Sequence, residues 1–345
     1  MPKVMMQDLV EFGTQLLVKK GLPEADARYI AEIAATTEAA GVPTHGAVIF
    51  TTYDSQVGPF IDVKARPKVV KERGATACID GNRAFSHLAW RLAADLAVKK
   101  ARELGVAMVG VRNTSWLGGL GAFLIPIARA GLFAQLWAHS SQCQDSVPTG
   151  GVDARFSTNP VAIAFPTAGD PVIADFSTAV FSMGKVGQLA AKGERAPEKV
   201  FYDKHGTLTD DPKVVRDAGG MLTWGQQLTG HKGYAFAFWC EALTAMAGGW
   251  CNDPKREQRQ SFNLTVIDPE AFAGLDYYRA EMKRFVEWLR SSRPAPGVEK
   301  IRLPGERMLA QIAASQKSGI EMGAALVDRL NDAAKKNGLA ALKTA

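Results

Sequence analysis

The hydrophobic positions of the first sixty residues recur at the spacing of α-helices. Gly21 is placed to end one helix, and Pro23 followed by acidic Glu24 and Asp26 is typical of the start of another. The pattern therefore predicts a small helical unit at the start of the chain, whose first apolar stripe consists of Leu9, Val10, Phe12, Leu16 and Leu17.

From Gly74 onward the pattern changes to short apolar runs of the length of β-strands. A long amphipathic helix is predicted over residues 86–104, and a second one contains Ile125 and Ile127. Because the strands are spaced too irregularly for strict strand–helix alternation, a mixed sheet is favoured over a doubly wound parallel one. The predicted strands cover residues 75–80, 106–111, 132–138, 161–165, 172–175 and 262–267.

The tail of the chain, from Tyr277, returns to a helical pattern, with Pro294 and Pro296 marking a connection. Small terminal segments seldom form a core alone, so the two helical ends are expected to pack together beside one sheet domain. We predict a mixed α/β protein of two domains. Residues 1–73 and 276–345 form a helical domain, and residues 74–275 form a mixed-sheet domain.

The composition is that of a folded protein, with 47% hydrophobic and 22% charged residues. The N-terminus lacks the features of a secretory signal, because Asp8 and Glu11 interrupt its apolar positions. Residues 233–250 form the longest apolar stretch, but Glu241 and three glycines within it favour a buried helix over a membrane span. The four scattered cysteines are expected to be buried thiols in a reducing compartment. A cytoplasmic protein without a membrane partner is predicted.

The formal net charge of +6 permits binding to nucleic acid without implying it. The densest basic stretch, residues 64–73, has no interleaved aromatic residues on which bases could stack. A solvated linker explains this stretch, and no nucleic-acid partner is expected.

Several common catalytic motifs are absent from the sequence. It contains no G-x-S-x-G, no G-x-x-x-x-G-K-[ST] and no H-E-x-x-H, and no metal site is predicted among its five histidines. Residues 118–121 read Gly-Gly-Leu-Gly and do not complete G-x-G-x-x-G, so a standard Rossmann unit is unsupported.

Six segments carry more information than the periodicity does. Their order and spacing resemble the malate/L-lactate dehydrogenase type 2 family, which includes ureidoglycolate dehydrogenases, diketogulonate reductases and cyclic imino-acid reductases. The resemblance covers nearly the whole chain. The segments are Thr-His-Gly at 44–46, Val-Arg-Asn at 111–113, Pro-Thr-Gly-Gly at 148–151 leading to Ser-Thr-Asn-Pro at 157–160, Ala-Asp-Phe-Ser-Thr at 174–178, Gly-His-Lys-Gly-Tyr at 230–234 and Pro-Gly-Glu at 304–306.

This resemblance implies a helical domain built from both termini and a mostly antiparallel central sheet that binds NAD or NADP without a Rossmann fold. It also implies a homodimer and a reversible hydride transfer between NAD(P)H and a C=O or C=N carbon of a small organic substrate. The dinucleotide carries the hydride chemistry, so the protein must hold it, orient the substrate and manage one proton.

His45 is the candidate for the proton transfer, because an imidazole can donate or accept a proton near neutral pH. Taken alone, a histidine between Thr44 and Gly46 would more often have only a structural role. Because it matches the family's Ser-His-Gly motif, which contains the catalytic acid/base, the catalytic role becomes the favoured one. Thr44 keeps the hydroxyl group of the family's serine and could orient the imidazole or contact the substrate.

The resemblance also implies the residues that hold the dinucleotide. Small hydroxyl side chains and backbone amides suit phosphate and ribose oxygens. Lys232 offers a cation to a phosphate, and this role is favoured over the alternative of an ordinary cap before the helix that begins near Tyr234. Asn159 and Pro160 either start a strand that faces the nicotinamide or form a purely structural turn. The remaining cofactor candidates are Asp175, Phe176, Ser177, Thr178, His231, Pro304, Gly305 and Glu306.

The sequence departs from the family pattern around the presumed substrate. Ile49 stands where the family has the arginine that binds the substrate carboxylate, Ala40 replaces a second arginine, and Trp116 replaces a second histidine. Residues 41–63 contain no Lys or Arg at all. We therefore hypothesise a pocket lined by Trp116, Ile49 and Tyr53, with Phe50 nearby, for a bulkier, flatter or less anionic molecule. Trp116 could instead be buried core.

The alternative from another functional class is a catalytically silent protein that binds NAD(P) as a sensor or a structural partner. Retention of His45 favours the enzyme.

Overall fold

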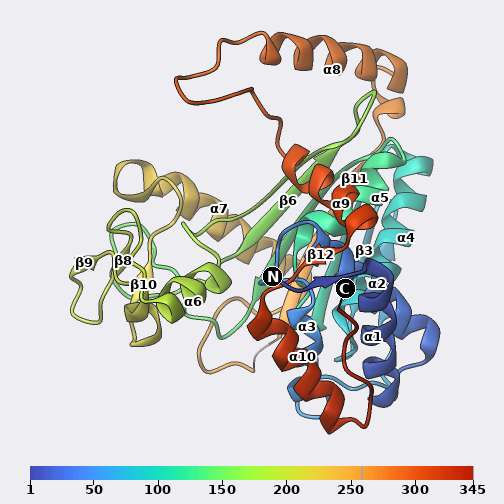
Figure 1. Ribbon diagram of the computed structural model, residues 1–345. Coiled ribbons are helices and arrows are strands. Elements are labelled where there is room, and N and C mark those ends of the chain that lie inside the picture. The colour runs from blue at the N-terminus through green and yellow to red at the C-terminus, as the bar shows by residue number, and fades with distance from the viewer. Residues whose placement is uncertain (258, 345) are drawn as a thin grey trace.

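The computed structural model describes residues 1–257 and 259–344 and centres on one seven-stranded sheet (Figure 1). Every neighbouring pair of strands is antiparallel except β3 and β4, which confirms the mixed, mostly antiparallel sheet. The strands, in spatial order, are β2 (Lys68–Arg73), β3 (Thr76–Asp80), β4 (Val106–Thr114), β11 (Gln260–Ile267), β5 (Phe133–Ser140), β6 (Pro160–Phe165) and β7 (Val172–Ser177).

Two helices, α4 (Ser86–Leu104) and α5 (Leu120–Arg129), pack against this sheet. Three alanines of α4, at positions 89, 93 and 97, are fully buried and lie on one face of the helix. Their small side chains allow the helix to approach β4 and β11 closely. Gly105 ends α4 with a φ of 83°, a left-handed conformation that glycine adopts without strain.

The two ends of the chain pack together, as the sequence predicts. Strand β1 (Lys3–Val4) pairs with β12 (Ile320–Glu321), α2 contacts α9, and α3 contacts α10. One hydrophobic core continues from these helices into the sheet. The helices concerned are α1 (Met6–Lys19), α2 (Glu24–Ala39), α3 (Val48–Gln56), α9 (Glu306–Ser318) and α10 (Ala324–Lys336).

Residues 183–221 form a unit that we call the small lobe, at the left of Figure 1. It has its own hydrophobic core around Val186, Phe201 and Met221. The sequence pattern did not predict it, because its strands are only two residues long. Its elements are α6 (Met183–Lys192), β8 (Phe201–Tyr202), β9 (Leu208–Thr209), the 3-10 helix η1 (Pro212–Arg216) and β10 (Gly220–Met221).

The long helix α7 (Gln226–Met246) has a kink at Thr229 and buries only one face. Phe238 and Trp239 are exposed, so the expectation of a buried helix holds only for the side of Ala237 and Cys240. A short 3-10 helix, η2 (Pro269–Ala271), precedes α8 (Leu275–Arg290), which projects from the body and has no buried residue (Figure 1). Within the described residues, none of the helices has the length and apolar character that a bilayer crossing requires.

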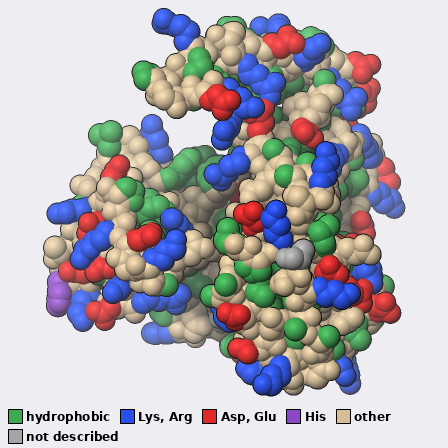
Figure 2. Space-filling model, in the orientation of Figure 1, with side chains coloured by type: hydrophobic (Ala, Val, Ile, Leu, Met, Phe, Trp, Pro, Cys, Tyr) green, Lys and Arg blue, Asp and Glu red, His purple; other side chains and the backbone are tan. Residues whose placement is uncertain are grey.

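Two further expectations need correction. Residues 68–73 of the basic stretch are not a linker but the exposed edge strand β2, whose charged side chains suit the unprotected edge of a sheet. Of the four cysteines, none of which forms a disulfide, only Cys240 is buried, and Cys251 is exposed. Basic and acidic side chains are interspersed over the face shown in Figure 2, without an extended stripe of one sign.

Candidate active site

The turn that carries His45 is fixed to the end of α2. A Cβ atom on Gly46 would lie 2.7 Å from the Cα atom of Glu38, so only glycine fits at this position. The buried Glu38 carboxylate accepts a hydrogen bond from the backbone amide of Ala47 at 2.8 Å, and burial raises its pKa. The start of α3 is therefore held from α2, and the imidazole is presented from a rigid turn.

The His45 ring has two close neighbours. Its Nδ1 atom lies 2.7 Å from the Thr44 hydroxyl oxygen, and its ring centre lies 5.3 Å from that of Trp116 at a tilt of 50°. Burial lowers the pKa of His45 to about 4, so the imidazole is neutral at pH 7. Since Nδ1 contacts Thr44 and no described residue hydrogen-bonds Nε2, the second nitrogen is available to a ligand.

His45 lies between two cavities that share part of their lining. The first, of about 330 Å³, is bounded by residues 175–177 of β7, by Gly305 and by Arg307. The second, of about 350 Å³, is bounded by Trp116 and by polar side chains of several loops and strands. The residues common to both are Thr44, His45, Gly118, Leu120, Thr158, Pro160 and Ser182.

The wall of the first cavity is held by two close contacts of β7, one with the start of α5 and one with the loop at Gly305. Asp175 accepts a hydrogen bond from the amide of Gly121, at the N-terminus of α5, at 2.7 Å. Burial of the carboxylate raises the pKa of Asp175 to about 6, although that amide opposes the shift. Gly305 has a φ of 89°, and a Cβ atom on it would lie 2.9 Å from the backbone nitrogen of Ile173. Phe176 and Ser177 complete this wall.

Several predicted cofactor residues lie outside both cavities. Pro304 and Glu306 line a larger hollow under α8, where Glu306 pairs with Arg290. His231 and Lys232 are exposed on the first turns of α7 and line neither cavity.

Asn159 and Thr178 lie behind the cavity wall and are fully buried. The Asn159 amide donates hydrogen bonds to the carbonyl of Ala237 at 3.1 Å and to Glu241 at 3.0 Å, which ties β6 to α7. Thr178 donates from its hydroxyl to the carbonyl of Thr158 at 3.0 Å. Both side chains thus hold the wall in position, and their contact with a cofactor stays a prediction.

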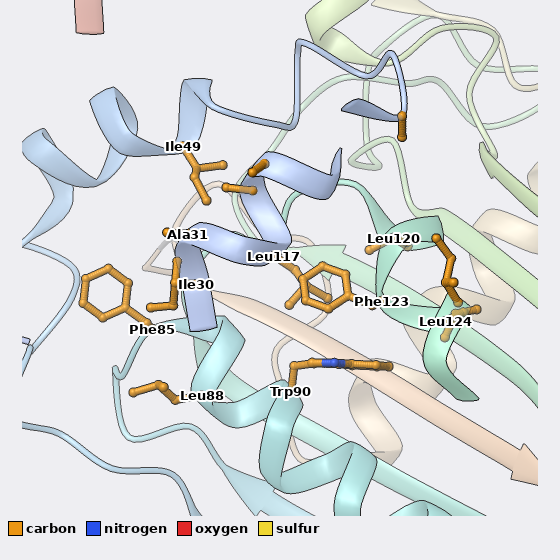
Figure 3. Close-up of a cluster of buried hydrophobic side chains, with 14 of the residues drawn as sticks. Ile30, Ala31, Ile49, Phe85, Leu88, Trp90, Leu117, Leu120, Phe123 and Leu124 are labelled. Atoms are coloured by element: carbon orange, nitrogen blue, oxygen red, sulfur yellow. The ribbon is translucent and has the colours of Figure 1, made fainter. Parts of the chain in front are cut away.

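Two of the three predicted substrate contacts are part of the core. Ile49 is 1% exposed and belongs to the cluster of buried hydrophobic side chains drawn in Figure 3. Tyr53 is fully buried and donates its hydroxyl to the carbonyl of Trp116 at 2.8 Å. Of the three, only Trp116 lines the second cavity, and its partly buried ring also packs against the core.

Sequence reasoning missed the polar residues of the second cavity. Asp145, His139 and Arg216 come from a loop, from β5 and from η1, and no local motif joins them. His139 is buried, with Nδ1 3.2 Å from Glu241. Burial raises the pKa of Asp145 to about 6, and the positive charge of Arg216 opposes that shift.

Beside the first cavity, one buried polar atom has no partner. The Nε1 atom of Trp224 makes no hydrogen bond, and the Trp224 ring lies 5.3 Å from that of Phe176. Trp224 lines neither cavity, and its Nε1 atom is packed against Gly233 of α7, where a Cβ atom would lie 2.3 Å from it. No group of three or more potential metal ligands occurs in residues 1–257 or 259–344.

The chain has close matches among known proteins. The malate/L-lactate dehydrogenase family model matches residues 4–331. The malate dehydrogenase of Pyrococcus abyssi is 29% identical over 351 residues, which cover 99% of this chain and 96% of that protein. The Δ1-pyrroline-2-carboxylate/Δ1-piperideine-2-carboxylate reductase of Pseudomonas syringae pv. tomato is 30% identical over 337 residues, 94% of each chain. The solved structure of malate dehydrogenase from Pyrococcus horikoshii OT3 has a TM-score of 0.88 at 27% identity, covering 99% of this chain and 97% of that one.

Proposed function

Because this chain belongs to the malate/L-lactate dehydrogenase family and is a dehydrogenase or reductase acting on CH–OH or C=N groups, we propose that it catalyses reversible hydride transfer between NAD or NADP and a small hydroxy acid, oxo acid or cyclic imine. One observation carries the proposal: His45 lies where two ligand-sized cavities meet. A proton donor in that position can serve a substrate in one cavity while a nicotinamide ring occupies the other.

The first cavity fits the nicotinamide end of the dinucleotide. Gly305 and Gly121 bring backbone close to the cavity wall, and Ser177 offers a small hydroxyl group. When bound, the dinucleotide supplies or accepts the hydride.

His45 performs the proton transfer. In the oxidative direction the neutral imidazole accepts the hydroxyl proton of the substrate at Nε2. In the reductive direction the same atom returns a proton to the developing alkoxide or amine. The Thr44 hydroxyl holds Nδ1 at 2.7 Å and so keeps Nε2 available to the substrate. Trp116 covers one side of the ring and limits access of water to it.

Two measurements test the proposal. We expect NADH or NADPH to bind in the micromolar range, detected by the change in nucleotide or tryptophan fluorescence. With the nucleotide that binds, we expect turnover of at least one member of a panel of 2-oxo acids and Δ1-piperideine-2-carboxylate. Binding without any turnover would favour the catalytically silent protein instead. Absence of nucleotide binding would refute both functions.

We further propose that the enzyme is a homodimer; its cytoplasmic location stays a prediction from the sequence. The support lies in α8, which has no buried residue and exposes Tyr277, Phe285 and Trp288. An apolar surface of this kind on a projecting helix is suited to a second copy of the chain. Light scattering of the purified protein should give twice the chain mass of 37.1 kDa, and a monomer would contradict the proposal.

A further inference from the structure

The second cavity contains a cation that the sequence pattern did not place there. Ile49, where the resemblance places a carboxylate-binding arginine, is buried in the core. Arg216 nevertheless lines the cavity that His45 borders. It is the one Lys or Arg among the described residues of that lining. Arg216 belongs to η1 of the small lobe, whereas Ile49 belongs to α3.

The backbone that carries Arg216 is firmly held. The 3-10 helix η1 begins at a capped position, where the Asp211 side chain accepts a hydrogen bond from the amide of Lys213 at 3.0 Å. Pro212 and Val215 are buried, and η1 packs against α6. Arg216 itself, at the end of η1, is exposed. A fixed backbone with an exposed guanidinium is a suitable arrangement for binding an anion.

Arg216 is also left without a counter-ion. Elsewhere in this lobe Arg195 pairs with Asp210 at 2.8 Å, and Lys204 pairs with Asp217 at 3.1 Å. Arg216 makes no ion pair with any residue of 1–257 or 259–344. The acidic residue of the described cavity lining, Asp145, is close enough for the charge of Arg216 to lower its pKa but forms no ion pair with it. The guanidinium therefore keeps its donors for a ligand.

We propose that Arg216 binds the carboxylate, or an equivalent anionic group, of the substrate and thereby replaces the arginine lost at Ile49. The inference rests on the function proposed above and narrows it to anionic substrates. It differs from the expectation of a less anionic substrate, which rested on the absence of Lys and Arg from residues 41–63. The planar guanidinium can donate two parallel hydrogen bonds to a carboxylate and so orient the adjacent C=O or C=N carbon towards His45.

The test compares matched substrates in matched variants. The panel contains 2-oxo acids from pyruvate to phenylpyruvate and Δ1-piperideine-2-carboxylate, each beside its uncharged primary amide. We expect wild-type kcat/KM to favour the carboxylate over the amide by about 100-fold or more. Arg216→Gln should raise KM for the carboxylate by about 100-fold, change kcat much less and leave the amide nearly unaffected. Arg216→Lys should recover part of the loss.

The control is Lys213→Gln, which removes a positive charge from the same 3-10 helix at an exposed position outside the cavity lining. We expect it to leave KM unchanged. Equal use of amides and carboxylates, or an unchanged KM in Arg216→Gln, would overturn the inference while the proposed function stands. If the protein binds the nucleotide and turns over substrates but none of the carboxylates, the proposed role of Arg216 is wrong. Loss of nucleotide binding in the wild type would instead refute the proposed function itself.

Discussion

At the scale of single residues, the burial of His45 sets the direction of its pH dependence. Its pKa of about 4 leaves on the order of one molecule in a thousand protonated at pH 7. The reductive reaction needs the protonated form, so its kcat/KM should fall about tenfold for each pH unit between pH 5 and pH 7. The oxidative reaction needs the neutral form and should be flat over the same range. Steady-state profiles in both directions measure this.

The variant His45→Asn tests whether His45 is the group that transfers the proton. His45→Asn keeps a polar side chain but cannot exchange a proton, so we expect kcat to drop by about 10²- to 10⁴-fold. Nucleotide binding, measured by fluorescence, should change little. A reductive profile that stays level from pH 5 to pH 7 in the wild type would contradict the assignment of His45.

Which residues form the site was only partly predictable. His45 and Thr44, which border both cavities, could be selected from the sequence because they lie in one short motif that resembles a family's motif. Ile49 was assigned to the pocket because the resemblance places a substrate-binding arginine at that position, and Tyr53 was grouped with it, but both side chains are buried in the core. Arg216 and Asp145 could not be found, since the cavity joins segments 71 residues apart and neither segment has a recognisable motif. Contact across the fold is not encoded in local spacing.

At the scale of elements, the site depends on how closely α6 approaches the turn of Thr44. A Cβ atom on Gly184 would lie 2.5 Å from the Cβ atom of Thr44, so Gly184→Ala must displace α6 or the turn. We expect kcat/KM to fall by about 10- to 100-fold, because Thr44 orients His45 and small displacements of catalytic groups are costly. Steady-state kinetics of the variant measure the effect.

The control for this prediction lies three residues along the same helix. A Cβ atom on Gly187 would meet nothing within 4 Å, and the residue is exposed. Gly187→Ala should leave kcat/KM unchanged and stabilise the protein by about 0.5–1 kcal/mol, because alanine favours the helix. Equal activity of the two variants would show that the approach of α6 to Thr44 is unimportant for catalysis.

Predictability at this scale followed the strength of the apolar pattern. The central strands and α4 were predicted within a few residues, because each has an apolar run or a helical stripe long enough to recognise. The edge strand β2 was missed because all six of its side chains are exposed and no apolar alternation remains. The small lobe was missed because two-residue strands leave no periodicity, although its own core is apolar.

At the scale of the whole molecule, the packing of both chain ends against one sheet was predictable from the amount of apolar surface that each segment has to bury. The sequence did not show that the terminal helices and the sheet would share one hydrophobic core. One hydrophobic core runs from the terminal helices to the sheet, and His87 lies within it at 1% exposure. Its Nδ1 atom is 3.3 Å from the hydroxyl of Tyr53 in α3, and its ring lies 5.3 Å from that of Phe123 in α5.

This position couples a single proton to the stability of the whole fold. Burial lowers the pKa of His87 to about 3, whereas the unfolded chain takes up the proton near pH 6.5. Below pH 6.5 the unfolded state therefore binds more protons, and His87 lowers the free energy of unfolding by about 1.4 kcal/mol per pH unit. Between pH 7 and pH 5 the wild type should lose about 2 kcal/mol more than His87→Asn, measured by urea denaturation. The burial of Asp145 and Asp175 has the opposite effect in this range, but both residues are present in both proteins and cancel in the difference. If the free energy of unfolding depends on pH in the same way in both proteins, His87 can be protonated in the folded state and the prediction is wrong.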